Sequence, residues 1–355
     1  MNDTRAASGR HVPVLFLAVV FVILAVLAAV LLYWRHVYSD PVPASTEAHP
    51  ASTVRQQAYL ARYSETPVPT LPGPYLSSPA PTETSAVEAA PSPTPEGLLG
   101  GKYAWRFTES EVLTDHTYSN PTVSITWGMY RDELSYSNRV VFYVADVLIQ
   151  DVTSLTTAFA KGSYAAGGRR PMETIAKNNH CIIAISGDFA RWHNNGLIIR
   201  NGEIFREKKL SFDLAVLYKD GVLETYEPGT VTLEEILEKE PWQSWHFGPE
   251  LLDHEGKPKT RFNTTVGGRN PRAAIGYYEP GHYCLVLVDG RQRKYSLGLT
   301  MKELSQLMYT LGCVRAYNLD GGATAHMTWL DEVINSPSKD RQVHDIICVC
   351  FPSNT

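Results

Sequence analysis

The sequence of 355 residues has little charge and no large excess of either sign: charged residues make up 19% of it, and the formal net charge is -5. A chain without a basic surplus lacks the electrostatic footprint of a general nucleic-acid binder. Five cysteines in a chain of this length are too few for a disulfide-dense scaffold, and none stands in a C-x-x-C motif. The histidines show no H-x-x-x-H or H-E-x-x-H spacing, which argues against the common zinc motifs.

The cysteines are predicted to be small buried hydrophobic residues, because they stand in apolar, strand-like runs. Cys348 and Cys350 are two residues apart and are expected to face the same side of a strand. An odd number of cysteines leaves at least one free thiol unless an intermolecular bond forms.

One long hydrophobic run stands near the N-terminus. Residues 12–34 carry no charge, and these 23 residues would rise roughly 34 Å as a helix, enough to cross a hydrocarbon core of about 30 Å. Tyr33 and Trp34 end the run as interfacial aromatic residues do. We therefore expect a cytoplasmic arm over 1–11, a transmembrane signal-anchor helix over 12–34, and a single-pass protein of the cell membrane with an extracellular globular domain. A cleaved signal peptide is the alternative.

A proline-rich segment follows the hydrophobic run. About half of the 23 prolines fall between Pro41 and Pro95, mixed with Ser, Thr and Ala. Proline donates no backbone hydrogen bond, so such a segment cannot form regular helix or sheet. Residues 35–96 are therefore predicted to be an extended linker, and residues 97–355 to be one globular domain.

The globular part alternates short apolar runs with turn signals. Residues 140–150 and 181–186 predict strands, and the turns at 201–202, 220–221 and 279–281 predict hairpins. Capping boxes begin two of the predicted helices, at Thr232 with Glu235 and at Thr300 with Glu303. Hairpins outnumber βαβ units, so we expect an α+β fold with a large mixed or antiparallel sheet and flanking helices.

Three aspartates end strand-like runs, each beside a glycine: Asp188, Asp289 and Asp320. Polar groups at strand ends can converge on one rim of a sheet, although Asp-Gly is also an ordinary turn, and that alternative stays open for Asp289. After Asp320, residues 321–322 leave the backbone bare beside the Thr324 hydroxyl, an arrangement suited to a phosphate or an oxyanion.

Basic side chains accompany these turns. Arg272 follows the glycine pair 267–268, and a guanidinium offers a bidentate fork to phosphate or carboxylate. Arg291 opens a second basic cluster, for which a solvated surface is an equal explanation. His344 and His326 are candidate acids because histidine titrates near neutrality, with a packed or surface histidine as the alternative.

Residues 318–327 resemble the N-L-D-G-G-G-S-S-x-M motif of the phosphodiester glycosidase domain family. Further segments resemble motifs of this family in the same order: 185–189, 270–276, 288–291, 298–304 and 335–338. The resemblance covers most of the globular part, and Ser186 stands where the family motif has asparagine.

The resemblance implies hydrolysis of a sugar-1-phosphodiester, of the GlcNAc-1-phosphodiester kind, to a free sugar and a phosphomonoester. Cell-surface or exopolysaccharide glycans are the expected substrates. Carboxylates stabilise the oxocarbenium-like transition state or activate the nucleophile. We expect Asp320 or Asp188 to be the nucleophile or general base, and Asp289 to be a second carboxylate or an orienting group. The expected sugar and phosphate contacts are Arg272, Asn318, Gly321, Gly322, Thr324, Arg291 and His344.

No cofactor is expected, although a Ca²⁺ or Mg²⁺ ion held by Asp188, Asp289 or Asp320 is an alternative, since hard cations prefer oxygen ligands. Two other functions fit the same residues. One is a metal-dependent phosphodiesterase that cleaves the P–O bond, and the other is a non-catalytic surface module that binds phosphate-containing glycans. Neither requires a nucleic acid, and the sequence carries no signal for an oligomeric state.

Overall fold

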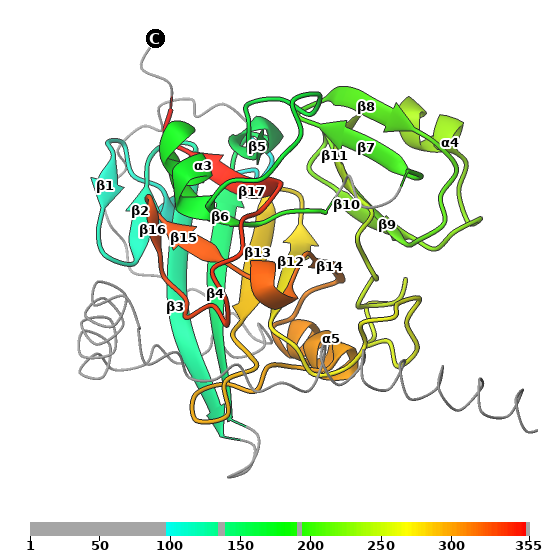
Figure 1. Cartoon of the computed structure of the whole chain (residues 1–355). Helices are drawn as coiled ribbons and strands as arrows, with labels where there is room; N and C mark the ends of the chain where they lie inside the picture. The colour runs from blue at the N-terminus through cyan, green and yellow to red at the C-terminus, as the bar shows by residue number, and fades with distance from the viewer. Residues whose placement is uncertain (1–96, 134–138, 190–193, 353–355) are drawn as a thin grey trace, which may run out of the picture. The chain divides into compact units, whose positions relative to one another are not determined.

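The computed structural model describes residues 97–133, 139–189 and 194–352 (Figure 1). The expected arm, transmembrane helix and linker, residues 1–96, lie outside this part. Among the helices that the structure describes, none is long and apolar enough to span a membrane.

Two antiparallel sheets form the body of the described domain. The larger has the strand order β1-β2-β3-β4-β13-β12-β14. Its strands are β1 (Val112–Leu113), β2 (Thr117–Ser119), β3 (Val123–Glu133), β4 (Arg139–Ile149), β13 (His282–Val288), β12 (Arg272–Glu279) and β14 (Arg315–Leu319). The smaller has the order β16-β15-β6-β17-β5. Its strands are β16 (Glu332–Val333), β15 (Met327–Trp329), β6 (Cys181–Ser186), β17 (Asp345–Cys350) and β5 (Leu155–Phe159).

Shorter elements complete the described part. A three-stranded sheet joins β10 (Leu223–Tyr226), β9 (Leu214–Tyr218) and β11 (Pro241–Trp245), and a hairpin pairs β7 (Leu197–Arg200) with β8 (Glu203–Glu207). The α-helices are α3 (Met172–Asn178), α4 (Leu233–Glu238) and α5 (Met301–Thr310). Three 3₁₀ turns are η1 (Ala104–Arg106), η2 (Val152–Ser154) and η3 (Gly322–Thr324).

The seven-stranded sheet is covered on both faces. On one face, helix α5 buries Leu304 and Met308 in a core cluster with Phe142 of β4. On the other face, Trp127 of β3 lies 6.2 Å, centroid to centroid, from Trp329 of β15, so the five-stranded sheet packs there. Burial on both sides explains why β4 is apolar almost throughout instead of alternating.

The expected sheet-rich architecture is confirmed, and the pairings of both large sheets are antiparallel. Both predicted capping boxes form, at the starts of α4 and α5. Strands β3, β5 and β11 were not predicted. β5 and β11 mix Thr, Ser or Gln with apolar residues. Thr157 of β5 bonds to Gln243 of β11, and Ser244 of β11 bonds to the backbone of β7, contacts that no local pattern shows.

Candidate active site

The end of β6, the end of β14 and the start of β17 are hydrogen-bonded to one another where the two large sheets meet. The Asp320 N–H donates to the Gly187 carbonyl at 3.0 Å, and the Gly187 N–H donates to the Asp345 carbonyl at 3.1 Å. The Ser186 hydroxyl donates to the Asp320 carbonyl at 2.9 Å. Position 187 must be glycine for this approach, since a Cβ there would lie 2.8 Å from Asp345 Oδ1. Residues far apart in the sequence therefore bring their carboxyl groups together.

Asp188 is fully buried and is held through one of its oxygens. Its Oδ2 accepts hydrogen bonds from Arg200 Nη2 at 3.1 Å, from the His246 N–H at 3.0 Å and from His246 Nδ1 at 3.1 Å. Its Oδ1 is buried and has no hydrogen-bond partner within the described residues. The contacts to Oδ2 therefore fix the carboxylate in place, and Oδ1 makes none of them.

Arg200 and His246 are themselves held by neighbouring charges. Arg200, at the end of β7, also donates to Asp345 Oδ2 from Nε at 3.3 Å and from Nη2 at 3.2 Å. Arg206 Nη2 lies 2.9 Å from His246 Nε2. Because a guanidinium only donates, Nε2 accepts, and the proton of a neutral His246 sits on Nδ1, facing Asp188. The ring thus has one defined tautomer.

The pKa values of the carboxyl groups in this cluster shift in opposite directions, down for Asp188 and up for Asp320 and Asp345. Burial would raise the pKa of Asp188, but His246 and Arg200 hold it well below its usual range. Burial raises the pKa of Asp320 to about 7, and the neighbouring Asp188 adds to the shift. Burial likewise raises the pKa of Asp345 to about 7, against the opposing charge of Arg200. One carboxyl group with a lowered pKa therefore stands beside two with raised pKa values, the pattern of an acid–base site.

Asp289 is linked to the 318–327 loop through Asn335. Its Oδ1 accepts from Asn335 Nδ2 at 2.8 Å, and its Oδ2 accepts from the Ser336 N–H and the Tyr295 hydroxyl, both at 3.0 Å. Asn335 in turn donates to the Ala325 carbonyl at 3.1 Å. Burial raises the pKa of Asp289 to about 6. The contacts make Asp289 a support for the loop.

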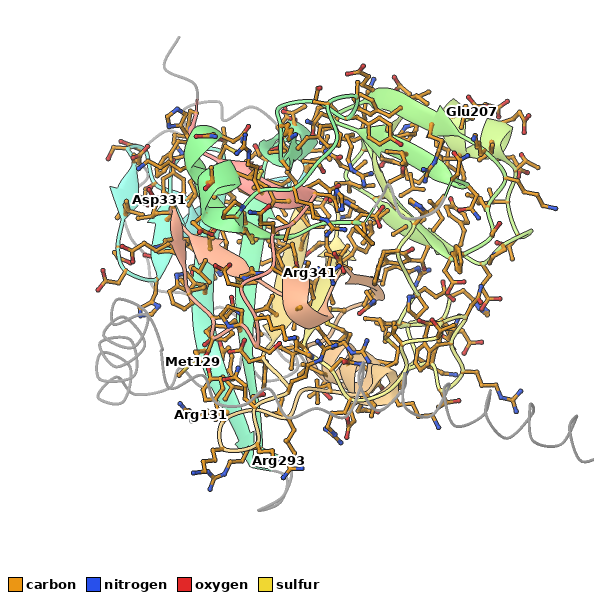
Figure 2. All side chains as sticks on the ribbon, viewed as in Figure 1. Met129, Arg131, Glu207, Arg293, Asp331 and Arg341 are labelled. Carbon is orange, nitrogen blue, oxygen red and sulfur yellow. The ribbon has the colours of Figure 1, made fainter. Side chains whose placement is uncertain are left out.

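Three arginines carry positive charge near Asp320. The charges of Arg341 and Arg169 act on its carboxyl group and oppose the rise of its pKa. Arg291 donates from Nε and Nη2 to Asn270 Oδ1, at 3.1 and 2.8 Å, and its Nη2 would lie 3.3 Å from a Cβ at position 322. Gly322 has φ +64 and no side chain, which leaves this space to the guanidinium. In Figure 2, Arg341 lies in the middle of the molecule, whereas Arg293 lies at its lower end.

Three of the predicted substrate contacts are occupied by the protein itself. Arg272 is 3% exposed and donates to the carbonyls of Leu299 and Val266, at 3.0 and 2.8 Å, and to that of Gly268. Asn318 is 1% exposed and donates to the Gly248 carbonyl at 2.7 Å. These two side chains brace loops through the carbonyls that they contact, and their contact with sugar or phosphate stays a prediction.

Thr324 is also buried, and its hydroxyl donates to the Gly321 carbonyl at 2.6 Å. This bond closes the turn that follows Asp320, and a Thr324 hydrogen bond also opposes the rise of the Asp320 pKa. The Gly322 N–H donates to the Pro271 carbonyl at 2.9 Å, so it is not free to bind an anion. The turn is therefore a scaffold that presents Asp320.

His344 lines an open hollow beside the cluster. The hollow has a volume of about 250 Å³, counted with the solvent at its mouth; it is lined by Phe159, Ser163, Tyr164, Gly167, Gly168, His344 and Asp345. His344 Nε2 accepts from Arg169 Nε at 2.9 Å, and its ring lies 4.6 Å from that of Phe189. The other candidate acid, His326, is buried, with Nδ1 donating to the Thr324 carbonyl at 3.0 Å. Only His344 of the two lines the hollow.

Four residues of the cluster were not predicted: Arg200, Arg206, His246 and Asp345. Arg200 precedes an Asn-Gly turn and Asp345 begins the last strand, so both look like ordinary hairpin or strand-end residues in the sequence. A charge at the end of an otherwise apolar run was the available signal in the sequence, since Arg200 directly follows Leu197–Ile199.

Within the described residues, Asp188, Asp289 and Asp320 do not bring three ligand atoms within 4.8 Å of one another.

Comparison with known proteins finds a family of domains that the part of the chain holding this cluster resembles. Residues 179–350 match the family model described as phosphodiester glycosidase. This match confirms the resemblance expected from the motifs, and it spans all four aspartates discussed above.

Curated relatives match over about half of the chain. The SPbeta prophage-derived uncharacterized protein YomE of Bacillus subtilis is 26% identical over 204 residues, 54% of this chain and 31% of that protein. The human N-acetylglucosamine-1-phosphodiester alpha-N-acetylglucosaminidase is 26% identical over 222 residues, 54% of this chain and 42% of that protein. The chain thus spans less than half the length of these relatives.

A solved structure shares the fold. The zebrafish N-acetylglucosamine-1-phosphodiester alpha-N-acetylglucosaminidase catalytic domain, auto-inhibited by its pro-peptide, superposes with a TM-score of 0.55 at 19% identity. The superposition covers 66% of this chain and 85% of that chain.

Proposed function

We propose that this chain, whose residues 179–350 match the phosphodiester glycosidase family model, hydrolyses sugar-1-phosphodiesters to a free sugar and a phosphomonoester. The observation that carries the proposal is the hydrogen-bonded junction of β6 and β14, which brings the Asp188 and Asp320 carboxyl groups near each other and near the charges of arginines. GlcNAc-1-phosphodiesters are the proposed substrate class, because two relatives are named for that activity.

Asp320 is the proposed general base or nucleophile. It is partly accessible, whereas Asp188 is 1% exposed and has one oxygen occupied by three hydrogen bonds. As a base, the Asp320 carboxylate takes a proton from water, and the water oxygen bonds to the anomeric carbon. The bond from that carbon to the phosphate oxygen breaks, and its electron pair leaves with the phosphomonoester. A base of this kind works best with a pKa near the operating pH.

The arginines supply what the leaving group needs. A phosphomonoester leaves readily and requires little proton donation, but its charge must be neutralised. Arg291 beside Gly322, together with Arg341 and Arg169, provides that charge at the edge of the cluster. Asp188, Arg200 and His246 are positioning residues that hold the β6 end against β14 and β17.

We further propose that the chain acts outside the cytoplasm, anchored by residues 12–34 and extended by the linker 35–96, on cell-surface or exopolysaccharide glycans. The uncharged run of 23 residues and the proline-rich segment support this placement. Protease added to intact cells should then remove the domain while leaving a short N-terminal fragment in the membrane. Protection of the whole chain until the cells are lysed would contradict it.

Isotope labelling tests the reaction. The full chain is incubated with UDP-GlcNAc in ¹⁸O-labelled water, and the products are analysed by mass spectrometry. Label in free GlcNAc means cleavage between the anomeric carbon and oxygen, as proposed. Label in the phosphate, with activity lost to a chelator, would instead assign the metal-dependent phosphodiesterase. Tight binding of a panel of phosphate-containing glycans without turnover would assign a binding module.

A further inference from the structure

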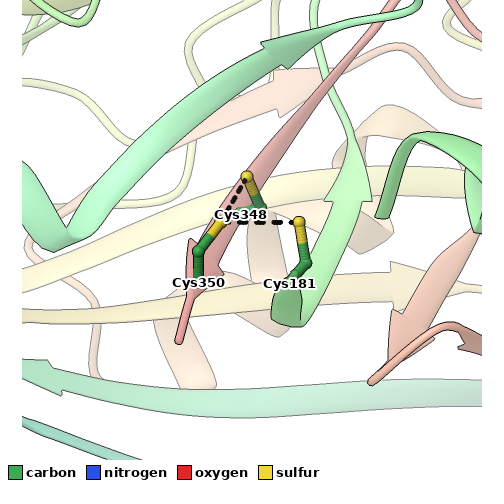
Figure 3. A group of neighbouring side chains, drawn as sticks. All are labelled: Cys181, Cys348 and Cys350. Atoms are coloured by element: carbon green, nitrogen blue, oxygen red, sulfur yellow. Dashed lines mark hydrogen bonds between the residues drawn. The ribbon is translucent and has the colours of Figure 1, made fainter. Parts of the chain in front are cut away.

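Three cysteines meet at the end of β6 and β17 that is remote from the candidate active site (Figure 3). Cys181 begins β6, and Cys348 and Cys350 lie at the end of β17. The Cys181 and Cys350 sulfurs are 3.5 Å apart, and the Cys348 and Cys350 sulfurs are 3.7 Å apart. All three sulfurs lie within 4.8 Å of one another.

An irregularity in strand pairing creates this arrangement. Cys348 pairs with Ala184 and Val349 with Ile183, so regular pairing would place Ile182 opposite Cys350. The register shifts there instead, and Cys181 pairs with Cys350. Because side chains alternate between faces, the shift turns Cys181 to the face that Cys348 and Cys350 share. Without the bulge the third sulfur would point to the opposite face.

We infer that Cys181, Cys348 and Cys350 bind one thiophilic metal ion of the Zn²⁺ type. Zinc holds thiolates at about 2.3 Å in a tetrahedral arrangement, which separates their sulfurs by about 3.8 Å. The two separations of 3.5 and 3.7 Å are close to that value without movement of the backbone. Three sulfurs leave a fourth position for water, and soft sulfur ligands exclude Ca²⁺ and Mg²⁺.

The surroundings suit a site that is closed on one side. Cys181 and Cys348 are buried in a cluster with Met172, Ile175 and Ile346, whereas Cys350 is partly exposed and gives the ion access. Thr156 Oγ1 lies 3.4 Å from the Cys348 sulfur and 3.9 Å from the Cys350 sulfur, within reach of a ligand thiolate.

The ion has no place in the proposed hydrolysis. Residues 181–186 of β6 separate the cluster from the active-site loop by about 17 Å at roughly 3.3 Å per residue. The ion joins β6 to β17 and so stabilises the folded chain. Binding releases the thiol protons to the solvent and changes no oxidation state. This inference stands apart from the proposed function.

The chain offers a matched control. Cys284 and Cys313 are also buried with their sulfurs 3.6 Å apart, but they lie in a different core cluster and number only two. Two sulfurs without a third cannot complete such a site. Cys284→Ser therefore removes a buried sulfur without touching the proposed ligands.

The test uses the full chain without a histidine tag, reduced and stripped of metal, and titrated with Zn²⁺ by calorimetry. The wild type and Cys284→Ser should bind one ion per chain, and Cys350→Ser should bind at least a hundredfold more weakly. Co²⁺ should give a thiolate-to-cobalt absorption band in the first two proteins and none in the third. Failure of the wild type to bind, or equal binding by Cys350→Ser, would overturn the inference.

A second measurement needs no variant. Zn²⁺ should protect Cys350 of the wild type from alkylation, and the modification of Cys284 and Cys313 should stay unchanged, as read by peptide mass spectrometry. A Cys181–Cys350 disulfide that persists in protein kept under reductant would also overturn the inference. Circular dichroism of the metal-free Cys350→Ser chain checks that it is folded.

Discussion

The Asp320 main-chain N–H donates to the Gly187 carbonyl at 3.0 Å, although the two residues follow strands of different sheets. This bond sets the end of β14 in the seven-stranded sheet against the end of β6 in the five-stranded sheet. Asp188 directly follows Gly187, so the same contact places the Asp188 charge near the Asp320 carboxyl group. The candidate active site is therefore built at the seam between the two sheets.

The buried Arg200 contact should be essential for stability. Arg200→Met removes the guanidinium that serves both Asp188 and Asp345 and leaves buried carboxylates without their counter-charge. Breaking a buried pair in this way costs about 3–5 kcal/mol. Urea denaturation should show a loss of that order in the free energy of unfolding. Arg200→Lys should recover only part of it, since one ammonium cannot reproduce the fork.

The pH dependence of stability should be unusual. Asp320 and Asp345 have pKa values raised to about 7, above their unfolded value of about 3.9. The folded state then binds more protons than the unfolded state between these values, so the free energy of unfolding falls as pH rises from about 4 to about 7. Asp188, with its pKa lowered, contributes stability that is lost in stronger acid.

Urea denaturation at pH 5 and pH 8 measures this difference. Each of the two groups contributes about 1.4 kcal/mol per pH unit over about two units, so the difference is expected to be on the order of 5 kcal/mol in favour of pH 5. Asp345→Asn keeps the size of the side chain but cannot titrate, so it should reduce the difference between the two pH values. An equal difference in the variant would remove Asp345 from this account.

The pH dependence of activity should run in the opposite direction. If the Asp320 carboxylate is the base, kcat/KM should rise about tenfold per pH unit below about 7 and level off above it. Measuring kcat/KM for a GlcNAc-1-phosphodiester as a function of pH gives this profile, which reports the pKa of the free enzyme. A rate that instead falls through pH 7 would make Asp320 the proton donor.

Substitutions of Arg291 and Arg272 should have different effects, the first on substrate binding and the second on stability. Arg291→Met should raise KM for the phosphodiester about tenfold or more and leave the unfolding transition nearly unchanged, because Arg291 is exposed. Arg272→Met should lower stability by about 1–3 kcal/mol, because its three backbone carbonyls lose a donor. Initial rates and urea denaturation of both variants check this, and a large KM effect confined to Arg272→Met would reverse the assignment.

Asp289 should matter less for chemistry than Asp320. Asp289→Asn keeps the shape but weakens the contacts to Asn335, Ser336 and Tyr295 that support the loop. We expect a loss in kcat of less than about tenfold, together with a lower midpoint of thermal unfolding. A hundredfold loss of kcat with unchanged stability would place Asp289 in the reaction itself.

Local signals predicted much of this fold. The Thr300–Glu303 capping box and the Asn-Gly turn at 201–202 act between near neighbours in the chain, and both form as expected. The convergence of Asp188 with Asp320 followed from their places at strand ends. Asp345, Arg200 and His246 could not be predicted, because most of their contacts in the cluster join residues far apart in the chain. Arg200 and Asp345 are 145 residues apart, and His246 and Asp188 are 58 apart, so these contacts depend on how the sheets pack. The backbone partners of Arg272 could not be predicted either, since its guanidinium donates to carbonyls that only the folded loop brings near.

Turnover of a GlcNAc-1-phosphodiester by Asp320→Asn, beside the wild type and the control Asp331→Asn, tests the central claim most directly. Asp331 is an exposed aspartate that lies at the left of the view in Figure 2, whereas Arg341 lies in its middle. We predict that Asp320→Asn lowers kcat at least a hundredfold with an unchanged fold, and that Asp331→Asn keeps the wild-type rate. A near-normal kcat for Asp320→Asn would contradict the account and remove Asp320 from the mechanism.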